Sequence, residues 1–85
     1  MTITYHPRFS KSFCKLSLKN QQQALFVIHK FRQNPKDPSL ETHPLKGSML
    51  GLFAFKVDPD LRIIFTFQGR DNVILLNVGG HEQVY

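Results

Sequence analysis

The second half of the chain holds three apolar segments separated by two short turn sequences, and this pattern restricts the possible fold more than any other feature. The segments are residues 52–57, 61–67 and 73–78, all rich in phenylalanine, leucine, isoleucine and valine. Between them lie the Asp-Pro-Asp sequence at 58–60 and the Gln-Gly-Arg-Asp-Asn sequence at 68–72, which are turn-forming by composition. Three such segments joined by tight turns predict an antiparallel β-meander.

The first half of the chain has helical rather than strand periodicity. Phe9, Phe13 and Leu16 share one face of a first predicted helix. A second helix is predicted to begin near Asn20 and to end before Pro35, and its apolar stripe consists of Ala24, Val27, Ile28 and Phe31. Residues 2–5 alternate between polar and apolar like an edge strand, and the Pro-rich stretch 34–39 is a loop.

The predicted element order is therefore β-α-α-β-β-β. It indicates an α+β fold in which two N-terminal helices pack on one face of a small twisted antiparallel sheet, while the other face meets water or a ligand. With 85 residues, we expect a single domain spanning 1–85.

Composition excludes several classes of protein. The single cysteine, Cys14, excludes a disulfide framework and a multi-cysteine zinc site, and we expect it to be buried in the first helix. No apolar run approaches the ~18 residues of a membrane span, and residues 1–7 contain no signal-peptide core. These features predict a cytoplasmic protein that has no membrane partner.

The positive charge is concentrated at one end of the sequence. Residues 1–40 carry seven basic side chains and one acidic side chain, a net of +6, whereas residues 41–85 carry four basic and five acidic ones, a net of −1. A basic domain of this size tends to meet polyanions such as RNA, although charge that only aids solubility would have the same composition.

Strand alternation places Lys56 and Arg62 on one face. In the segments 52–57 and 61–67 they point away from the face that carries Phe53, Phe55 and Phe65, and they flank the same turn. Two cations side by side make a candidate phosphate site; two solvated charges at a strand end are the alternative.

The four histidines favour acid–base chemistry over metal binding. No pair has the HxH or HxxxH spacing of a metal site. His43 and His81 each adjoin a loop rich in Pro or Gly, where reactive side chains are often placed. Imidazoles and cations suit RNA cleavage by 2′-hydroxyl attack, which needs a base, an acid and positive charge at the phosphorus.

Two stretches, HPLKGSMLGLFAFKVDPDLRIIFTF and ILLNVGGHEQVY, resemble the RelE/ParE superfamily of type II toxins, and most of all its YafQ-like and RelE/StbE-like mRNA interferases. The resemblance covers nearly the whole chain. It implies the same α+β fold and a toxin that enters the ribosomal A site and cuts mRNA without a metal or cofactor. It also implies a cognate antitoxin, with operator DNA bound only through that partner.

The resemblance also implies roles for individual residues. His43 matches a loop histidine that supports catalysis, His81 a near-terminal acid or base, and Asp60 a catalytic carboxylate of the YafQ-like branch. Arg62 matches an arginine that stabilises the phosphorane, and Tyr85 a terminal aromatic that stacks on a base or orients the phosphate.

Two lysines complete the expected site. Lys56 stands where one relative has a histidine, so the general base stays open between His43, Asp60 and His81. Lys46 is expected to bind backbone phosphate. Two other functions share this fold: a ParE-like toxin that inhibits gyrase, and a catalytically inactive binding or co-repressor module.

Overall fold

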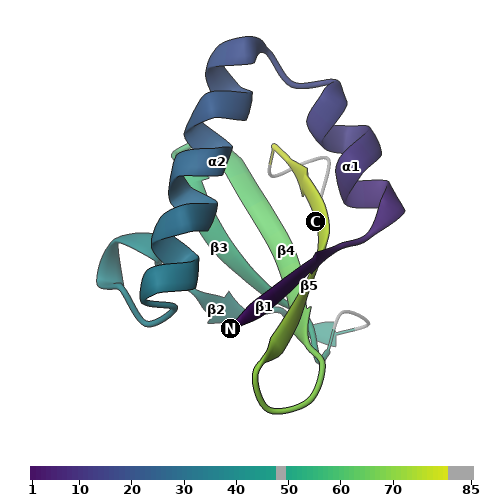
Figure 1. The fold of residues 1–85 in the computed structure, drawn as a ribbon, viewed down its shortest axis with the longest axis vertical. Helices are drawn as coiled ribbons and strands as arrows, with labels where there is room; N and C mark the ends of the chain where they lie inside the picture. The colour runs from purple at the N-terminus through teal and green to yellow at the C-terminus, as the bar shows by residue number, and fades with distance from the viewer. Residues whose placement is uncertain (48–49, 81–85) are drawn as a thin grey trace.

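A computed structural model describes residues 1–47 and 50–80 of the chain, and Figure 1 shows the fold. In chain order the elements are β1 (Thr2–Tyr5), α1 (Pro7–Cys14), α2 (Leu18–Gln33), the 3-10 turn η1 (Pro38–Leu40), β2 (His43–Pro44), β3 (Phe53–Asp58), β4 (Leu61–Phe67) and β5 (Asn72–Gly79). The strands form one sheet in the order β1-β5-β4-β3-β2. Two helices pack on this sheet, so the predicted α+β class is confirmed.

The meander is present as predicted, and two strand pairs extend it. β3, β4 and β5 pair antiparallel to one another, and the two-residue β2 adds an antiparallel edge to β3. At the other edge β1 runs parallel to β5, which makes the sheet mixed. Residues 2–5 thus form the expected edge strand, in an orientation that their alternation does not determine.

Local hydrogen bonds move the helix boundaries from their predicted positions. The side chain of Ser17 caps α2 by accepting a hydrogen bond from the backbone N–H of Asn20 at 3.1 Å, so Asn20 lies in the first turn instead of capping the helix. α1 ends at Cys14, so Leu16 lies in the connection between the helices, where it still packs against the core.

Cys14 is exposed, which corrects the expectation that it is buried. α1 turns Phe9 and Phe13 toward the core, and these residues lie four positions apart on one face. Because each residue advances ~100° around a helix, the residue after Phe13 points away from that face. The short helix therefore leaves the thiol at the surface.

The main core lies between the helices and the sheet, and aromatic rings dominate its centre. Phe31 of α2 stacks on Phe55 of β3, with ring centroids 4.6 Å apart, and meets Phe65 of β4 edge-on at 5.0 Å. All three side chains are almost completely inaccessible to solvent. The predicted stripe of α2 is confirmed, since all of its members are buried in this core: Ala24, Val27, Ile28 and Phe31.

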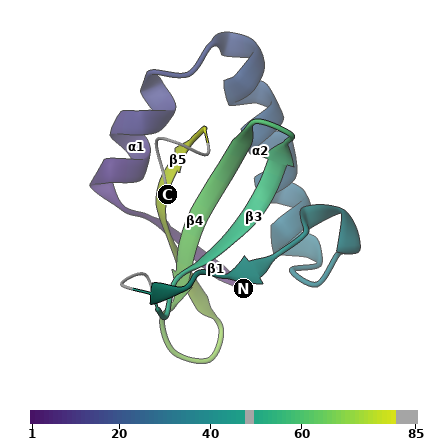
Figure 2. The ribbon, with the colours of Figure 1, turned by 180° about the vertical axis from the view of Figure 1, so that it is seen from behind.

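The opposite face of the sheet, seen in Figure 2, carries no helix over β3 and β4. Instead it carries a small apolar cluster in which Leu45 from the loop after β2 covers Ala54 and Ile64. Lys56 and Arg62 lie beyond this cluster toward the β3–β4 turn. Within the described ranges, no helix is long and apolar enough to cross a membrane.

Phe31 and Phe26 allow a matched test of this core, because both are phenylalanines of α2. Phe31→Ala removes the ring of a residue that is only 1% exposed, and we expect it to lower the free energy of unfolding by about 3–5 kcal/mol. Phe26 is 65% exposed, so Phe26→Ala is expected to cost less than about 1 kcal/mol. Urea unfolding measures both values, and equal losses would contradict the packing described.

Candidate functional site

Lys56 and Arg62 are direct neighbours across β3 and β4. The register pairs Lys56 with Arg62, two pairs beyond Ala54 and Ile64, which belong to the apolar cluster of the helix-free face. Directly opposite residues of an antiparallel pair project on the same side of the sheet. The predicted juxtaposition of the two cations on the face away from the main core is therefore confirmed.

Backbone oxygens of the β3–β4 turn hold the guanidinium of Arg62. Its Nη1 donates to the carbonyl oxygen of Asp58 at 2.7 Å and, at 3.5 Å, to that of Leu61. The turn is itself closed by the Asp58 side chain, which accepts from the backbone N–H of Asp60 at 2.8 Å. Carbonyl oxygens fix the orientation of the guanidinium without neutralising its charge.

The loop before β2 is anchored at both ends. The Asp37 side chain caps η1 by accepting from the N–H and the hydroxyl of Ser39, and these hydrogen bonds hold the pKa of Asp37 below its ordinary value. Leu40 is buried in the main core. Glu41 follows with φ 48°, in the left-handed region that non-glycine residues rarely adopt. This turn of the backbone directs the chain into β2 along the edge of the sheet.

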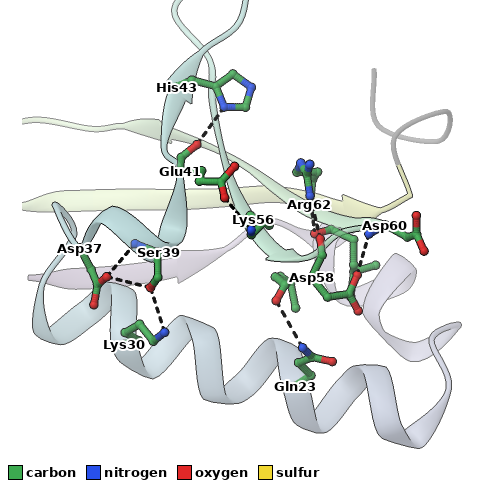
Figure 3. Close-up of polar contacts among 12 residues, drawn as sticks. Gln23, Lys30, Asp37, Ser39, Glu41, His43, Lys56, Asp58, Asp60 and Arg62 are labelled. Carbon is green, nitrogen blue, oxygen red and sulfur yellow. Dashed lines mark hydrogen bonds and ion pairs between the residues drawn. The ribbon is translucent and has the colours of Figure 1, made fainter.

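Glu41 reaches across to the two cations, although no pattern in the sequence indicates this position. Its Oε2 lies 2.5 Å from Nζ of Lys56 in an ion pair whose side chains are 60% and 30% exposed, respectively. The hydrogen bond from Lys56, together with the charge of Lys56, lowers the pKa of Glu41, and the charges of Arg62 and His43 act in the same direction. Four groups from three strands and a loop thus share one electrostatic environment (Figure 3).

His43 is oriented by the same residue. Its Nδ1 lies 3.0 Å from the backbone carbonyl oxygen of Glu41. Because a carbonyl oxygen only accepts, Nδ1 must carry the proton, and the neutral ring then has its lone pair on Nε2. The backbone of Glu41 therefore selects a tautomer of His43 while its carboxylate pairs with Lys56.

The other predicted site residues lie elsewhere or outside the described ranges. Asp60 is at the tip of the β3–β4 turn, and Figure 3 shows its carboxylate turned outward, away from Glu41 and Lys56. Lys46 follows Leu45, whose N–H bonds the carbonyl of Leu52, so it lies toward the end of β3 farther from that turn. His81 and Tyr85 fall among residues 81–85, which the structure does not describe.

An apolar groove adjoins this cluster at the β2 edge, with a volume of about 570 Å³. Glu41 and His43 contribute to its wall. The other lining residues are Phe31, Pro35, Lys36, Asp37, Pro38, Thr42, Pro44, Phe53, Phe65 and Phe67. Phe67, at 54% exposure, leaves much of its ring available to a flat apolar ligand.

The described part of the chain contains no group of three or more histidine, cysteine, aspartate or glutamate side chains placed to hold a metal ion. What the cluster can offer is positive charge from Lys56 and Arg62 beside an imidazole of defined tautomer. This combination suits the binding of a phosphate and the movement of a proton near it.

Comparison with solved structures places the fold among known toxins. A copper-bound mutant toxin from Helicobacter pylori is 27% identical, with a TM-score of 0.81 over 100% of this chain and 99% of that one. YafQ from Escherichia coli is 23% identical, with a TM-score of 0.79 over 98% of this chain and 96% of that one. A YoeB/ParE toxin from Agrobacterium tumefaciens is 14% identical, with a TM-score of 0.77 over 95% and 99%. No protein-family model matches the sequence, and a search of curated proteins returns no match.

These structures define the class of fold: it is that of the RelE/ParE superfamily of type II toxins, as the sequence motifs suggested. Within that class the chain is similar to the Helicobacter pylori toxin and to YafQ over almost the full length of each.

The Glu41–Lys56 pair predicts a specific titration. In Lys56→Met the carboxylate loses its ion-pair partner, so we expect the pKa of Glu41 to rise toward its ordinary value. The pKa of Glu41 is lower in the folded protein than in the unfolded chain, so its ionised carboxylate stabilises the folded state. This stabilisation is fully present at pH values above the pKa of the unfolded chain, and it is lost as the pH falls through the pKa of the folded protein. NMR titration of the Glu41 carboxyl carbon measures the change, and an unchanged pKa in Lys56→Met would contradict the pairing.

Proposed function

We propose that this chain is the toxin of a type II toxin–antitoxin system and that it cuts mRNA in the ribosomal A site as a metal-independent endoribonuclease. One observation carries the proposal: Lys56 and Arg62 stand side by side on one face of the sheet, and both act, as His43 does, on the carboxylate of Glu41. The fold shared with YafQ and the Helicobacter pylori toxin supports it.

In the proposed reaction the substrate supplies its own nucleophile. A ribose 2′-hydroxyl attacks the adjacent phosphorus while a general base removes the hydroxyl proton. The new P–O bond gives a phosphorane with added negative charge, and the bond to the 5′-oxygen then breaks as a general acid protonates that oxygen. The products are a 2′,3′-cyclic phosphate on one fragment and a 5′-hydroxyl on the other.

Arg62 and Lys56 are proposed to hold the phosphorane. Among the described residues, Nη1 of Arg62 donates hydrogen bonds to the carbonyl oxygens of Asp58 and Leu61. These bonds fix the plane of the guanidinium before the substrate binds. Donors held in place ahead of the reaction stabilise developing charge without reorganisation at the moment of reaction. Lys56 adds a point charge from the neighbouring strand.

His43, Asp60 and His81 are the proposed acid–base residues. The tautomer of His43 places a lone pair on Nε2, which favours His43 as the base. His81 is then proposed as the acid that protonates the leaving oxygen, and Asp60 is the alternative base. Tyr85 is proposed to orient the scissile phosphate or to stack on a base, and Lys46 to contact backbone phosphate farther along the strand.

The proposed partners follow from charge and from the comparisons. YafQ has been solved in complex with DinJ as a toxin–antitoxin complex, and this chain is 23% identical to that YafQ. We propose a cognate antitoxin for this chain as well, with operator DNA reached only through it. The +6 charge of residues 1–40 suits contact with ribosomal RNA, and such contacts weaken as salt rises.

Expression of the chain without an antitoxin tests the function directly. We expect growth arrest, arrest of translation and mRNA cut at defined positions, with cyclic phosphate at the new 3′ ends. Arrest with intact mRNA and a DNA-damage response would instead indicate the gyrase-inhibiting class of this fold. Normal growth at verified expression would indicate a binding or co-repressor module.

The matched variants in this assay are Arg62→Ala, near the start of β4, and Arg70→Ala, in the β4–β5 turn, which remove the same charge. We expect Arg62→Ala to slow single-turnover cleavage by about 10²–10³-fold, the usual cost of losing one donor to a developing oxyanion. Arg70 is exposed in the β4–β5 turn, so Arg70→Ala should cut at nearly the rate of the unmodified chain. Equal rates for the two variants would remove Arg62 from the reaction.

A further inference from the structure

Glu41 is an acid placed among groups whose proposed task is to bind an anion. Its Oε2 contacts Nζ of Lys56 at 2.5 Å, and Arg62 and His43 also act on its charge. An RNA phosphate approaching Lys56 would meet a carboxylate already in contact with that ammonium. Both anions present oxygen acceptors to the same three N–H donors, so they compete for them.

The backbone of Glu41 shows that this placement is enforced. It is the one non-glycine residue with a positive φ in the part of the chain that the structure describes. A conformation of this kind persists where the surroundings impose it, and it is often found at functional sites. Here buried Leu40 lies on one side and the pairing of His43 with Ala54 on the other, and between them they hold Glu41 facing β3.

The pair is also weak enough to exchange. The Glu41 side chain is 60% exposed and that of Lys56 is 30% exposed. Exposed ion pairs contribute no more than about fivefold to an equilibrium constant, and salt screens them. A phosphate that contacts Lys56 and Arg62 together can therefore displace the carboxylate.

From these observations we propose that Glu41 is a built-in competitor of the substrate phosphate: in the free protein its carboxylate occupies Lys56, and it must leave when RNA binds. This inference rests on the proposed function and goes beyond it by naming a residue that limits affinity for the RNA backbone. In this scheme the carbonyl oxygen of Glu41 keeps its hydrogen bond with Nδ1 of His43, so only the side chain of Glu41 moves.

The test is Glu41→Gln, which removes the charge and keeps the size of the side chain. The probe is a short single-stranded DNA oligonucleotide, which has phosphates but no 2′-hydroxyl, so binding is measured without cleavage. We expect Glu41→Gln to bind it about three- to tenfold more tightly at low salt, because the competing carboxylate and its repulsion of phosphate are both removed. The gain should shrink as salt is raised.

Asp71→Asn is the matched control because it makes the same change in net charge. Asp71 lies in the β4–β5 turn, about 20 Å along β4 from Arg62, and its side chain is 80% exposed. At that distance we expect less than a twofold change in oligonucleotide affinity. A gain equal to that of Glu41→Gln would show a general charge effect and overturn the proposal.

Lys56→Ala separates this inference from the proposed function. If Lys56→Ala weakens binding and the gain from Glu41→Gln disappears in the Lys56→Ala background, Glu41 acts through Lys56 as proposed. If Lys56→Ala weakens oligonucleotide binding but Glu41→Gln leaves the affinity unchanged or lowers it, the proposed competition by Glu41 is refuted, whereas the phosphate site is retained. If neither Lys56→Ala nor Arg62→Ala changes oligonucleotide affinity, the proposed phosphate site is refuted, and the proposed role of Glu41 is refuted with it.

A structural side effect of the substitution is checked in the same samples. The amide NMR spectrum of Glu41→Gln should differ from that of the unmodified chain only near residues 41–43 and 56. Glu41→Asn provides a second neutral variant, because asparagine tolerates the left-handed conformation well. Tighter binding by both variants supports the proposal, and weaker binding by Glu41→Asn in a folded protein would count against it.

Discussion

The pairing register of β3 and β4 determines which side chains enter the main core and where the two cations lie. It places Phe55 and Ile63 in the main core and Lys56 opposite Arg62 on the other face. Because side chains alternate along a strand, a slip of one residue in either strand would turn that strand's core residues to the opposite face and its cation toward the main core. The energy that stabilises the core therefore also holds the two positive charges together, and no separate interaction is needed to gather them.

The loop before β2 builds the remainder of the site on that sheet. Lys30 of α2 donates to Ser39, Asp37 caps η1, and Leu40 is buried, so the loop is tied to the helix layer before it reaches the sheet edge. Glu41 then directs one group to each of two neighbouring side chains: its carbonyl oxygen to His43 and its carboxylate to Lys56. The site thus joins the two layers of the fold, and a change in the loop is expected to alter both the imidazole and the ammonium.

Much of this arrangement could be predicted from the sequence because it depends on periodicity. The apolar stripe of α2, the three strands of the meander and the shared face of Lys56 and Arg62 all follow from spacings of 3.6 or 2 residues. In β5, however, alternation does not predict which side chains face the main core. A register shift against β4 lets Leu75 and Val78, three positions apart, both enter the main core, which simple alternation does not allow.

The role of Glu41 could not be predicted for a related reason. Its position depends on a left-handed backbone conformation at a non-glycine residue and on an ion pair with Lys56, which is fifteen residues away in the sequence. Neither feature produces a pattern that can be recognised in the local sequence. The direction in which β1 pairs with β5 is equally non-local. The resemblance to a toxin family supplied roles for single residues, whereas the structure shows which of the described residues share one environment.

In the proposed function Lys56 and Arg62 act on one phosphate, and a double-mutant cycle on mRNA cleavage measures whether they do. The single-turnover rates of the unmodified chain, Lys56→Ala, Arg62→Ala and the double variant give the coupling between the two residues. Two cations that hold one phosphorane should be coupled by at least about 1 kcal/mol, so the double variant loses much less than the two single losses combined. If instead the loss of transition-state stabilisation in the double variant equals the sum of the two single losses to within about 0.3–0.5 kcal/mol, the two residues act independently. That result would contradict a single phosphate site.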